Sequence, residues 1–574
     1  MFRAIASSLA LLSALWAGAV RAQADVVLLK SDTTAAFLMA NGGDYEKLLA
    51  PWRAFFKRQN IRARELPVAH LGTLAEPAVL ILPSTVALGE PERAAIRSRL
   101  AAGWSVLGTW ASGARDDKGA WQGYGFIEEL FACEVAADVI ARKDESFLLP
   151  FGETPLTHAL PAGKRMYLTQ TTEPFLRVRT ANAAARISDY LRDVADPGSL
   201  LGVAAFDERA GARRAFFGFA ETAWDSAQAD VDAMLLGTLD WLLRKPIVIK
   251  AAWPHPHEAA LLLEMDTEDK FENGQVFAAQ LERFRMRGTF YSLTQEAIRH
   301  PEVVKRIASR HEIAYHAEVH DGFAKLERKV QDARLQTMIR QMRSLLPDSP
   351  APSGFRPPLE EYDANTEKAL RASGLRHLAG SPDSRQDALP GFSSAEPGIS
   401  PDRALVVLPR TWLDDITLLR SGQLKQSAAE KLLLASLQDT VATRGLGLLS
   451  VHSQYFYPGS VMERVMPRFL ESIRKRGDAI WVAPAESIAR WWRDREAVQV
   501  SVQQEPRAVR IRLSVARGPV RRVRLVLFPP NATGTPPRLE AGATKARLQK
   551  LDAYRWAIVL PELARGESEL RVRF

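Results

Sequence analysis

The sequence predicts a multi-domain α/β protein that ends in an all-β segment, and three observations lead to this fold class. The chain has 574 residues, and a prior of about 150 residues per domain suggests three or four domains. From Asp25 to about Lys245, and again from about Ile247 to Trp492, short apolar runs alternate with segments of helical periodicity. This alternation is typical of parallel sheets covered by helices. After Glu496 the helical periodicity stops.

Residues 1–24 are typical of a cleaved secretory signal peptide. A cation precedes an apolar run over residues 4–20, and the small residues Ala22 and Ala24 form a cleavage site. The apolar run is shorter than the roughly 20 residues that span a bilayer, so cleavage is favoured over an uncleaved membrane anchor. We therefore expect a periplasmic or secreted protein without a transmembrane span after cleavage. The lone Cys133 cannot form an internal disulfide.

Residues 25–246 predict an open α/β domain of the flavodoxin-like kind. The runs DVVLLKS, AVLILPS and WSVLGTW have the character of strands, and DYEKLLAPWRAFFKRQN and ERAAIRSRLAAG have that of helices. The pattern and its LILPS edge resemble class I glutamine amidotransferase-like domains. Those enzymes need a cysteine on a tight strand-to-helix turn, and Cys133 in ELFACEVAADV lacks that setting. We therefore expect a non-catalytic domain, used for carbohydrate binding or for structural support.

The middle segment, 247–495, contains the candidate functional residues. His316 and His320 have i, i+4 spacing, which on a helical turn puts two imidazoles on one face, about 5–6 Å apart between Cβ atoms. Such a pair can chelate a metal, although it also occurs on solvated helix faces. Upstream, an apolar strand ends in Asp266, Glu268 and Asp269. Carboxylates there are costly unless solvated, paired or metal-bound, and barrel active sites lie at that end of a strand.

Five motifs of this segment resemble, in order, those of the polysaccharide deacetylase superfamily (NodB-homology, carbohydrate esterase 4-like). They are AALLLEMDTED, RGTFYSL with the following HPEVVKRIA and the histidine pair, SGFRPPLEEYDANTEKALRASGLRH, GLGLLSVHSQYF, and VMPRFLESIRKRGDAIWVAPAESIARWW. The resemblance implies a deformed (β/α)7-type barrel over 247–495. The three-part layout and the acid-x-acid motif also resemble, more narrowly, the Pel-type exopolysaccharide deacetylases.

The resemblance implies a metal site made by Glu268, His316 and His320. Family members usually have two adjacent aspartates where this chain has Asp-Thr-Glu-Asp, so Asp269 is the alternative acid ligand. Asp266 matches the general base, and Zn²⁺ is the expected cofactor, with Co²⁺, Ni²⁺ or Fe²⁺ also accepted by these ligands. Such a centre lowers the pKa of a bound water from about 16 toward about 7.

Further roles follow from the other motifs. Arg356 matches the arginine that orients the base, and Leu359 takes the position whose backbone N–H stabilises the oxyanion. His452 matches the catalytic acid, although a lone histidine on such a strand is more often a core residue. In TWLDD, Trp412 resembles the wall of the acetyl pocket, and Asp414, with its neighbour Asp415 as the alternative, resembles the carboxylate that tunes the acid. A plain tryptophan and turn after a strand would look the same.

The implied activity is hydrolysis of acetamide groups on an amino-sugar polysaccharide, with release of acetate. The expected partners are such a polymer, either a biofilm exopolysaccharide or a cell-wall glycan, and exopolysaccharide export machinery. Two alternatives stay open: a catalytically inactive glycan-binding or assembly protein, favoured by the altered acidic motif and the extra domains, and a hydrolase of a non-sugar amide.

Residues 496–574 predict a small β-sandwich. The runs VQVSVQQ, AVRIRLSV, VRRVRLVLF, YRWAIVL and ELRVRF are short strands separated by Pro, Gly and Asn. The formal net charge is +9, but acidic and basic residues are mixed along most of the chain. The exception is the arginine-rich stretch 507–528, which predicts a solvated basic strand face or, alternatively, a surface for an anionic glycan or lipid headgroup. We expect no nucleic-acid partner, because the protein is expected to be exported.

Overall fold

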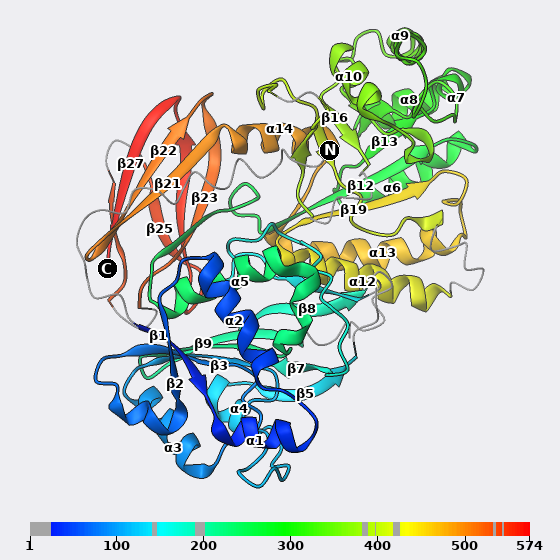
Figure 1. Cartoon of the computed structure of the whole chain (residues 1–574). Coiled ribbons are helices and arrows are strands. Elements are labelled where there is room, and N and C mark those ends of the chain that lie inside the picture. The colour runs from blue at the N-terminus through cyan, green and yellow to red at the C-terminus, as the bar shows by residue number, and fades with distance from the viewer. Residues whose placement is uncertain are drawn as a thin grey trace.

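The computed structural model describes residues 25–140, 146–189, 201–380, 388–395, 398–416, 425–531, 535–541 and 545–574. They form three packed parts: an N-terminal α/β part, a middle α/β part and a C-terminal all-β part (Figure 1). The predicted signal peptide, residues 1–24, lies outside the described residues. Within the described ranges, no helix combines the length and the apolar character needed to cross a bilayer.

An eight-stranded sheet forms the N-terminal part, in the order β2-β1-β3-β4-β10-β9-β8-β6. Its strands are β1 (Asp25–Lys30), β2 (Ala63–Pro67), β3 (Ala78–Leu82), β4 (Ser105–Thr109), β6 (Ser146–Pro150), β8 (Ala183–Asp189), β9 (Ala204–Arg209) and β10 (Ala212–Phe217). β1 to β4 and β10 run parallel, whereas β9, β8 and β6 add antiparallel pairs. A separate two-stranded antiparallel sheet pairs β5 (Glu134–Val139) with β7 (Phe175–Arg179).

Helices cover both faces of this sheet, which explains why the central parallel strands β3 and β4 are buried along their whole length. Val26 and Leu28 of β1 share one core with α2 (Glu46–Arg58) and α5 (Gln228–Leu242), whereas Val27 and Leu29 share the other with α3 (Glu90–Ala101) and α4 (Gly125–Phe131). α1 (Asp32–Ala40) follows β1 directly. Cys133 comes just after α4, and burial raises the pKa of its thiol to about 12, so it has none of the acidity of a nucleophilic cysteine.

The middle part is an α/β fold with a curled, half-barrel sheet, as expected for a deacetylase-type barrel. Its order is β17-β18-β16-β15-β14-β13-β12-β19, with β20 beside the start of β12. The strands are β12 (Ala259–Thr267), β13 (Thr289–Ser292), β14 (Glu312–Tyr315), β15 (Gly354–Phe355), β16 (His377–Ala379), β17 (Gly391–Phe392), β18 (Val406–Leu408), β19 (Leu446–His452) and β20 (Ile480–Val482). All pairs are parallel except β17 with β18.

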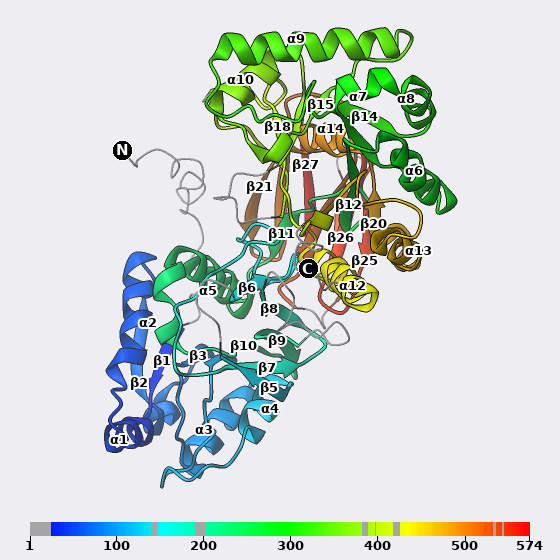
Figure 2. The same cartoon turned by 90° about the vertical axis from the view of Figure 1, so that its right-hand side faces the viewer.

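Helices pack on the outer side of this sheet (Figure 2). They are α6 (Gly274–Arg283), α7 (Thr294–Arg299), α8 (Pro301–Ala308), α9 (Arg328–Leu345), α10 (Ala364–Ala372), α12 (Gln426–Thr443) and α13 (Val461–Arg474). α14 (Ala485–Glu496) packs instead where the inner apolar residues of the sheet meet the C-terminal part. α12 also contacts the N-terminal part, because Asp439 pairs with Arg186 of β8 and both are buried.

The C-terminal part is a sandwich of two four-stranded antiparallel sheets, β11-β23-β26-β25 and β21-β22-β27-β24. The strands are β11 (Ile247–Lys250), β21 (Val498–Glu505), β22 (Ala508–Val515), β23 (Val520–Phe528), β24 (Arg538–Ala541), β25 (Arg547–Lys550), β26 (Trp556–Leu563) and β27 (Gly566–Arg573). β11 corrects the predicted boundary at 246/247, because it pairs with β23 rather than with the barrel.

The arginine-rich strands carry their own counter-charges. Arg510 and Arg512 of β22 form ion pairs with Glu569 of β27, and Arg571 of β27 pairs with Glu505 of β21. These pairs neutralise much of the basic face that the sequence predicted. They fit the solvated strand face better than a surface for a polyanion.

Candidate active site

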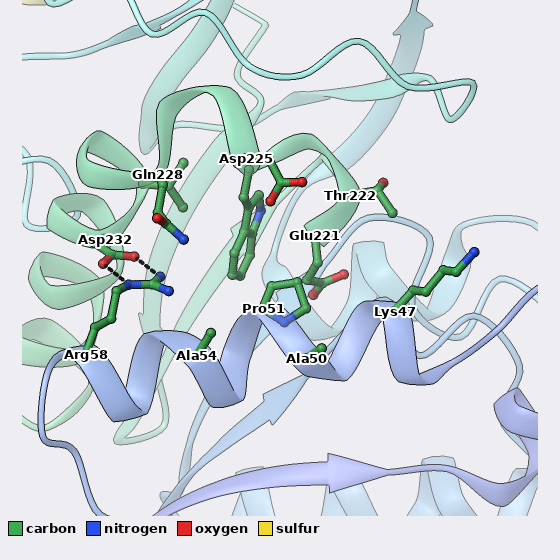
Figure 3. A pocket seen from close by; sticks show the side chains of 12 residues that line it. Lys47, Ala50, Pro51, Ala54, Arg58, Glu221, Thr222, Asp225, Gln228 and Asp232 are labelled. Carbon is green, nitrogen blue, oxygen red and sulfur yellow. Dashed lines mark hydrogen bonds and ion pairs between the residues drawn. The ribbon is translucent and has the colours of Figure 1, made fainter.

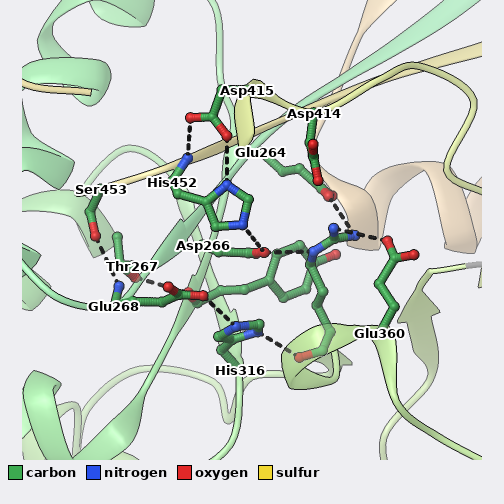
Figure 4. Close-up of polar contacts among 12 residues, drawn as sticks. Glu264, Asp266, Thr267, Glu268, His316, Glu360, Asp414, Asp415, His452 and Ser453 are labelled. Atoms are coloured by element: carbon green, nitrogen blue, oxygen red, sulfur yellow. Dashed lines mark hydrogen bonds and ion pairs between the residues drawn. The ribbon is translucent and has the colours of Figure 1, made fainter. Parts of the chain in front are cut away.

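The register between β12 and β19 brings the first two candidate residues together. Asp266, one residue before the end of β12, lies directly beside His452, the last residue of β19. Both are buried, and His452 Nε2 lies 3.5 Å from Asp266 Oδ2. Because parallel strands end at the same edge, the residues after β12, β14, β15 and β19 meet there as well. Figure 4 shows this cluster.

Glu268 and the two predicted histidines converge on one point. Glu268 Oε1 lies 3.0 Å from Nε2 of His316 and 3.0 Å from Nε2 of His320. Burial opposes the ionisation of Glu268, but the hydrogen bonds with His316 and His320 outweigh it and lower the pKa of the carboxyl. The ligand atoms of the three residues lie within 4.8 Å of one another, so the group can hold a metal ion.

A hydrogen bond fixes the orientation of His316. Its Nδ1 lies 2.8 Å from the backbone oxygen of Arg356, so Nδ1–H donates to that carbonyl and Nε2 is the ring atom that faces Glu268. His316 is buried, whereas the side chain of His320 is 38% exposed. The group of three proposed metal ligands is therefore open to solvent on the side of His320.

The histidine pair does not lie on a helix, which corrects the prediction from its spacing. Both residues belong to the loop after β14, and Ala317 between them has φ +102°. This left-handed backbone turns the chain where a helix would continue, and the two ring centroids come to 5.5 Å from each other. A non-glycine residue in that region is costly and is often found at functional sites.

Glu268, not Asp269, is the acid that faces the imidazoles. Asp269 is exposed, and its backbone oxygen accepts a hydrogen bond from Ser453 Oγ at 2.8 Å. Ser453 Oγ also accepts the backbone N–H of Glu268 at 2.9 Å. The segment after β19 therefore holds the chain just after β12 in place.

Arg356 holds the predicted base within a ring of carboxylates. Its Nε donates to Asp266 Oδ2 at 2.8 Å, Nη1 lies 3.1 Å from Glu264 Oε1, and Nη2 lies 3.1 Å from Glu360 Oε1. Glu264 lies fully buried in β12, and burial raises the pKa of its carboxyl to about 8. Of these three acids, the prediction named only Asp266.

Asp415, not the predicted Asp414, is the carboxylate that contacts His452. Asp415 Oδ1 lies 2.6 Å from His452 Nδ1, and Asp415 Oδ2 accepts the backbone N–H of His452 at 2.8 Å. Asp414 instead lies 3.5 Å from Arg410 Nη1. Consecutive residues of this turn point in different directions, and the sequence could not show which one faces β19.

Burial lowers the pKa of His452, but Asp415, Asp266 and Glu268 outweigh it and raise the pKa to about 9. The imidazole is therefore protonated near neutral pH, as a general acid must be.

Trp412 lies in the hydrophobic core rather than at the site, which corrects its predicted role as a wall of the acetyl pocket. Its Nε1–H donates to Thr440 of α12 at 3.1 Å, and its ring meets Phe469 of α13 at 5.8 Å. The indole packs directly against the backbone of Gly447 in β19, so closely that a Cβ added at this glycine would lie 2.8 Å from the ring. Gly447 precedes His452 by five positions in β19, roughly 17 Å along a strand.

Leu359 lies at the surface of the same edge, three residues after Arg356. Its side chain is 64% exposed and its φ is +59°, within the short 3₁₀ turn Pro358–Glu360. The structure does not place its backbone N–H against a substrate, so its role stays a prediction.

Gln454 is a candidate that sequence reasoning missed. Its Nε2 donates to Glu268 Oε2 at 2.6 Å, so the amide holds one carboxylate oxygen while the other faces the imidazoles. The signal was present in the sequence, since Ser453 and Gln454 follow directly after the strand that ends in His452. Residues just past such a strand lie at the active-site edge.

Residues 268–378 match the polysaccharide deacetylase family model. Among solved structures, a putative polysaccharide deacetylase from Mycobacterium smegmatis has a TM-score of 0.38 and 22% identity, covering 45% of this chain and 97% of that one. A probable polysaccharide deacetylase from Pseudomonas aeruginosa PAO1 has a TM-score of 0.37 and 18% identity, covering 42% and 93%. A CE4 family pseudoenzyme from Bacillus anthracis has a TM-score of 0.30 and 13% identity, covering 41% and 66%. No curated protein matches the chain.

The matched segment contains Glu268, His316, His320 and Arg356, whereas Asp266 and His452 lie outside it. The match confirms, for residues 268–378, the resemblance to polysaccharide deacetylases that the sequence predicted.

Proposed function

We propose that this protein is a metal-dependent N-deacetylase that hydrolyses acetamide groups of an amino-sugar polysaccharide and releases acetate. One observation carries the proposal. Glu268, His316 and His320 form a group that can hold a metal ion. Asp266 and a protonated His452 lie next to this group, with His452 Nε2 3.5 Å from Asp266 Oδ2 and the ligand atoms of both within 4.8 Å of Glu268. This arrangement supplies an electrophile site, a base and an acid for the hydrolysis of one amide.

The donor set fits a divalent cation. Imidazole nitrogens and a carboxylate oxygen are the ligands of catalytic Zn²⁺ sites, and Co²⁺, Ni²⁺ and Fe²⁺ accept them too. Glu268, His316 and His320 would hold the ion, with Gln454 restraining the second oxygen of Glu268. A bound cation would polarise the acetamide carbonyl and make the attacking water more acidic.

Asp266 is the proposed general base. Its Oδ2 accepts a hydrogen bond from Arg356, which fixes the carboxylate, while Oδ1 has no hydrogen-bond partner among the described residues. That oxygen can accept the proton of the attacking water. The backbone N–H of Leu359 is the proposed additional donor to the developing oxyanion.

His452 is the proposed general acid. An amine leaves poorly as an anion, and protonation by a positioned acid typically contributes about 10² to 10⁴ in rate. The pKa of His452 is about 9, so the imidazole is protonated at neutral pH. Asp415 orients the ring through Nδ1, so that Nε2 faces Asp266. The proton of Nε2 would go to the leaving nitrogen.

The finer assignments belong to the same proposal. The N-terminal signal predicts a periplasmic or secreted enzyme, and the resemblance to Pel-type deacetylases suggests an exopolysaccharide as the polymer and export machinery as a partner. Purified protein incubated with acetylated hexosamine oligomers should release acetate, and metal analysis should find a divalent ion. Oligomer binding without acetate release would support instead the inactive glycan-binding alternative.

A further inference from the structure

The N-terminal part contains a pocket that is separate from the catalytic residues. It lies between α2 and residues 221–232, which comprise two 3₁₀ turns, Glu221–Ala223 and Asp225–Ala227, and the start of α5 (Figure 3). Its volume is about 450 Å³. Small-molecule sites usually measure about 300–1,000 Å³, so the space suits a small ligand.

One face of α2 forms the first wall. Ala50, Pro51 and Ala54 line the hollow, and Lys47 and Arg58 stand at its two ends. Pro51 has no backbone N–H, so the helix does not supply the usual i→i−4 donor to the carbonyl of Lys47. This wall therefore offers a short apolar floor and two cationic side chains.

The opposite wall balances the charge of the first. Asp232 accepts two hydrogen bonds from Arg58, at 2.9 and 2.8 Å, and Asp225 is an exposed carboxylate on the same side as Thr222 and Gln228. The accessible part of the lining thus has two cations, Lys47 and Arg58, and two anions, Asp225 and Asp232. The third acid of the lining, Glu221, is fully buried beneath them. A lining with many donors and acceptors but balanced charge favours a neutral, polyhydroxylated ligand over an ion.

The base of the pocket lies at the ligand-binding edge of the sheet. Glu221 lines the pocket and is fully buried. Its carboxylate accepts hydrogen bonds from Ser84 Oγ and Thr109 Oγ1, both at 2.6 Å, just after β3 and at the end of β4. Open α/β sheets bind ligands in the crevice outside the carboxyl ends of their strands. The pocket therefore lies where such sheets usually bind ligands, and this observation does not depend on which side chains line the pocket.

Trp224, whose side chain lines the same pocket, has an unused hydrogen-bond donor. Trp224 is 3% exposed, and its indole N–H has no hydrogen-bond partner in the part of the chain that the structure describes. A buried donor without a partner is rare in native proteins and calls for a physical reason. A ligand in the pocket would supply the missing acceptor after a small adjustment of the indole.

We propose that this pocket binds a neutral saccharide unit. The site does not depend on the catalytic residues, but its role, to hold the acetylated polymer while the distant site removes acetyl groups, rests on the proposed function. Because the lining is balanced, the pocket should prefer acetylated, neutral sugar units over deacetylated, cationic ones. The N-terminal part would then bind substrate in preference to product.

The binding test uses full-length protein with Asp266→Asn, so that the probe is not consumed, and the N-acetylglucosamine tetramer as the probe. Isothermal titration should resolve a binding event that Asp225→Ala weakens at least tenfold and Ala54→Trp, which fills the hollow, removes. Matched controls are Asp117→Ala and Ala101→Trp, exposed positions of the same part, which should leave the titration unchanged. Circular dichroism verifies the fold, and Asp225→Ala decides the outcome if Ala54→Trp does not fold.

Equal tetramer affinity in Asp225→Ala, in a folded Ala54→Trp and in both controls would overturn the proposal. So would tighter pocket binding of the fully deacetylated tetramer. In a catalytically intact background, Asp225→Ala should raise the KM for a long acetylated polymer severalfold and leave kcat unchanged. If no variant releases acetate, the deacetylase proposal fails, while the titration still decides whether the pocket binds saccharide.

Discussion

Asp415 holds His452 at two points: Oδ1 lies 2.6 Å from the ring Nδ1, and Oδ2 accepts the backbone N–H of the same residue at 2.8 Å. One carboxylate thus fixes both the last residue of β19 and the tautomer of its side chain. With Nδ1–H committed to Asp415, Nε2 faces Asp266 at 3.5 Å. The imidazole therefore lies between a carboxylate that orients it and a carboxylate that is the proposed base.

Replacing Asp415 with Asn should move the alkaline limit of activity. In the wild type, His452 has a pKa of about 9, so its acid form is present below that pH and activity should fall as pH rises through it. Asp415→Asn removes a negative charge, lowers the pKa of His452 and should reduce kcat by about 10²-fold. Measurement of kcat/KM between about pH 6 and pH 10 checks both effects. Asp414→Asn is the matched control and should keep the wild-type profile. An unchanged alkaline limit in Asp415→Asn would contradict the assignment of the acid.

The donor group predicts which substitutions separate metal binding from turnover. His316→Ala with His320→Ala removes two of three proposed ligands, and the bound metal should fall from about one ion per chain to near zero after dialysis. Asp266→Asn should keep the metal and lose turnover, because Asp266 contacts Arg356 and His452 rather than the two imidazoles. Elemental analysis of the purified variants measures both. If the double variant kept its full metal content, the ion would have to bind at another site.

The sequence identified the residues at strand ends better than those on turns. An apolar run that ends in a polar residue marks where a buried strand reaches the active-site edge, and Asp266 and His452 could be located in this way. Glu268, His316 and His320 lie together, in agreement with the predicted ligand set. The backbone that carries the two histidines differs from the prediction, because it is a loop and not a helix. A left-handed Ala317 brings the rings together, and i, i+4 spacing alone cannot distinguish such a loop from a helix.

Other failures have a common cause in long-range contacts. β11 looks like the first strand of the barrel, but its partner is β23, near the other end of the chain. Trp412 sits in a motif-like turn, yet the space for its indole is set by Gly447 and by α12 and α13. The choice between Asp414 and Asp415 depended on the path of a turn, which local residue types do not determine.

Gln454 should affect metal affinity more than folding. Its amide donates to Glu268 Oε2 at 2.6 Å and leaves Oε1 for the cluster. Partners that orient a ligand typically contribute 10- to 100-fold in metal affinity, so Gln454→Ala should weaken Zn²⁺ binding by about that factor. Competition with a chromophoric chelator measures the affinity without relying on activity. Tyr457→Ala, at an exposed position three residues further on, is the control. Equal Zn²⁺ affinity in both variants would leave Gln454 with no role in positioning Glu268.

Glu264 should be neutral in the working enzyme. Burial raises the pKa of its carboxyl from 4.5 to about 8, so at pH 7 it is protonated beside Arg356, which Asp266 and Glu360 already neutralise. Glu264→Gln has nearly the same shape as the protonated acid and should keep most of the activity at pH 7. Glu264→Ala removes a group in contact with the guanidinium and should cost about 1–3 kcal/mol of stability.

The pH dependence of stability gives the sharper readout for Glu264. A carboxyl whose folded pKa lies above its unfolded value makes the unfolded state release its proton first, so its burial costs more stability as pH rises from about 4.5 to about 8. Glu264→Gln has no such proton, and its stability relative to wild type should therefore increase over that range. Urea unfolding at both ends of the range measures the difference. A constant difference, together with loss of activity in Glu264→Gln, would mean that Glu264 is ionised and that Arg356 needs its charge to hold Asp266.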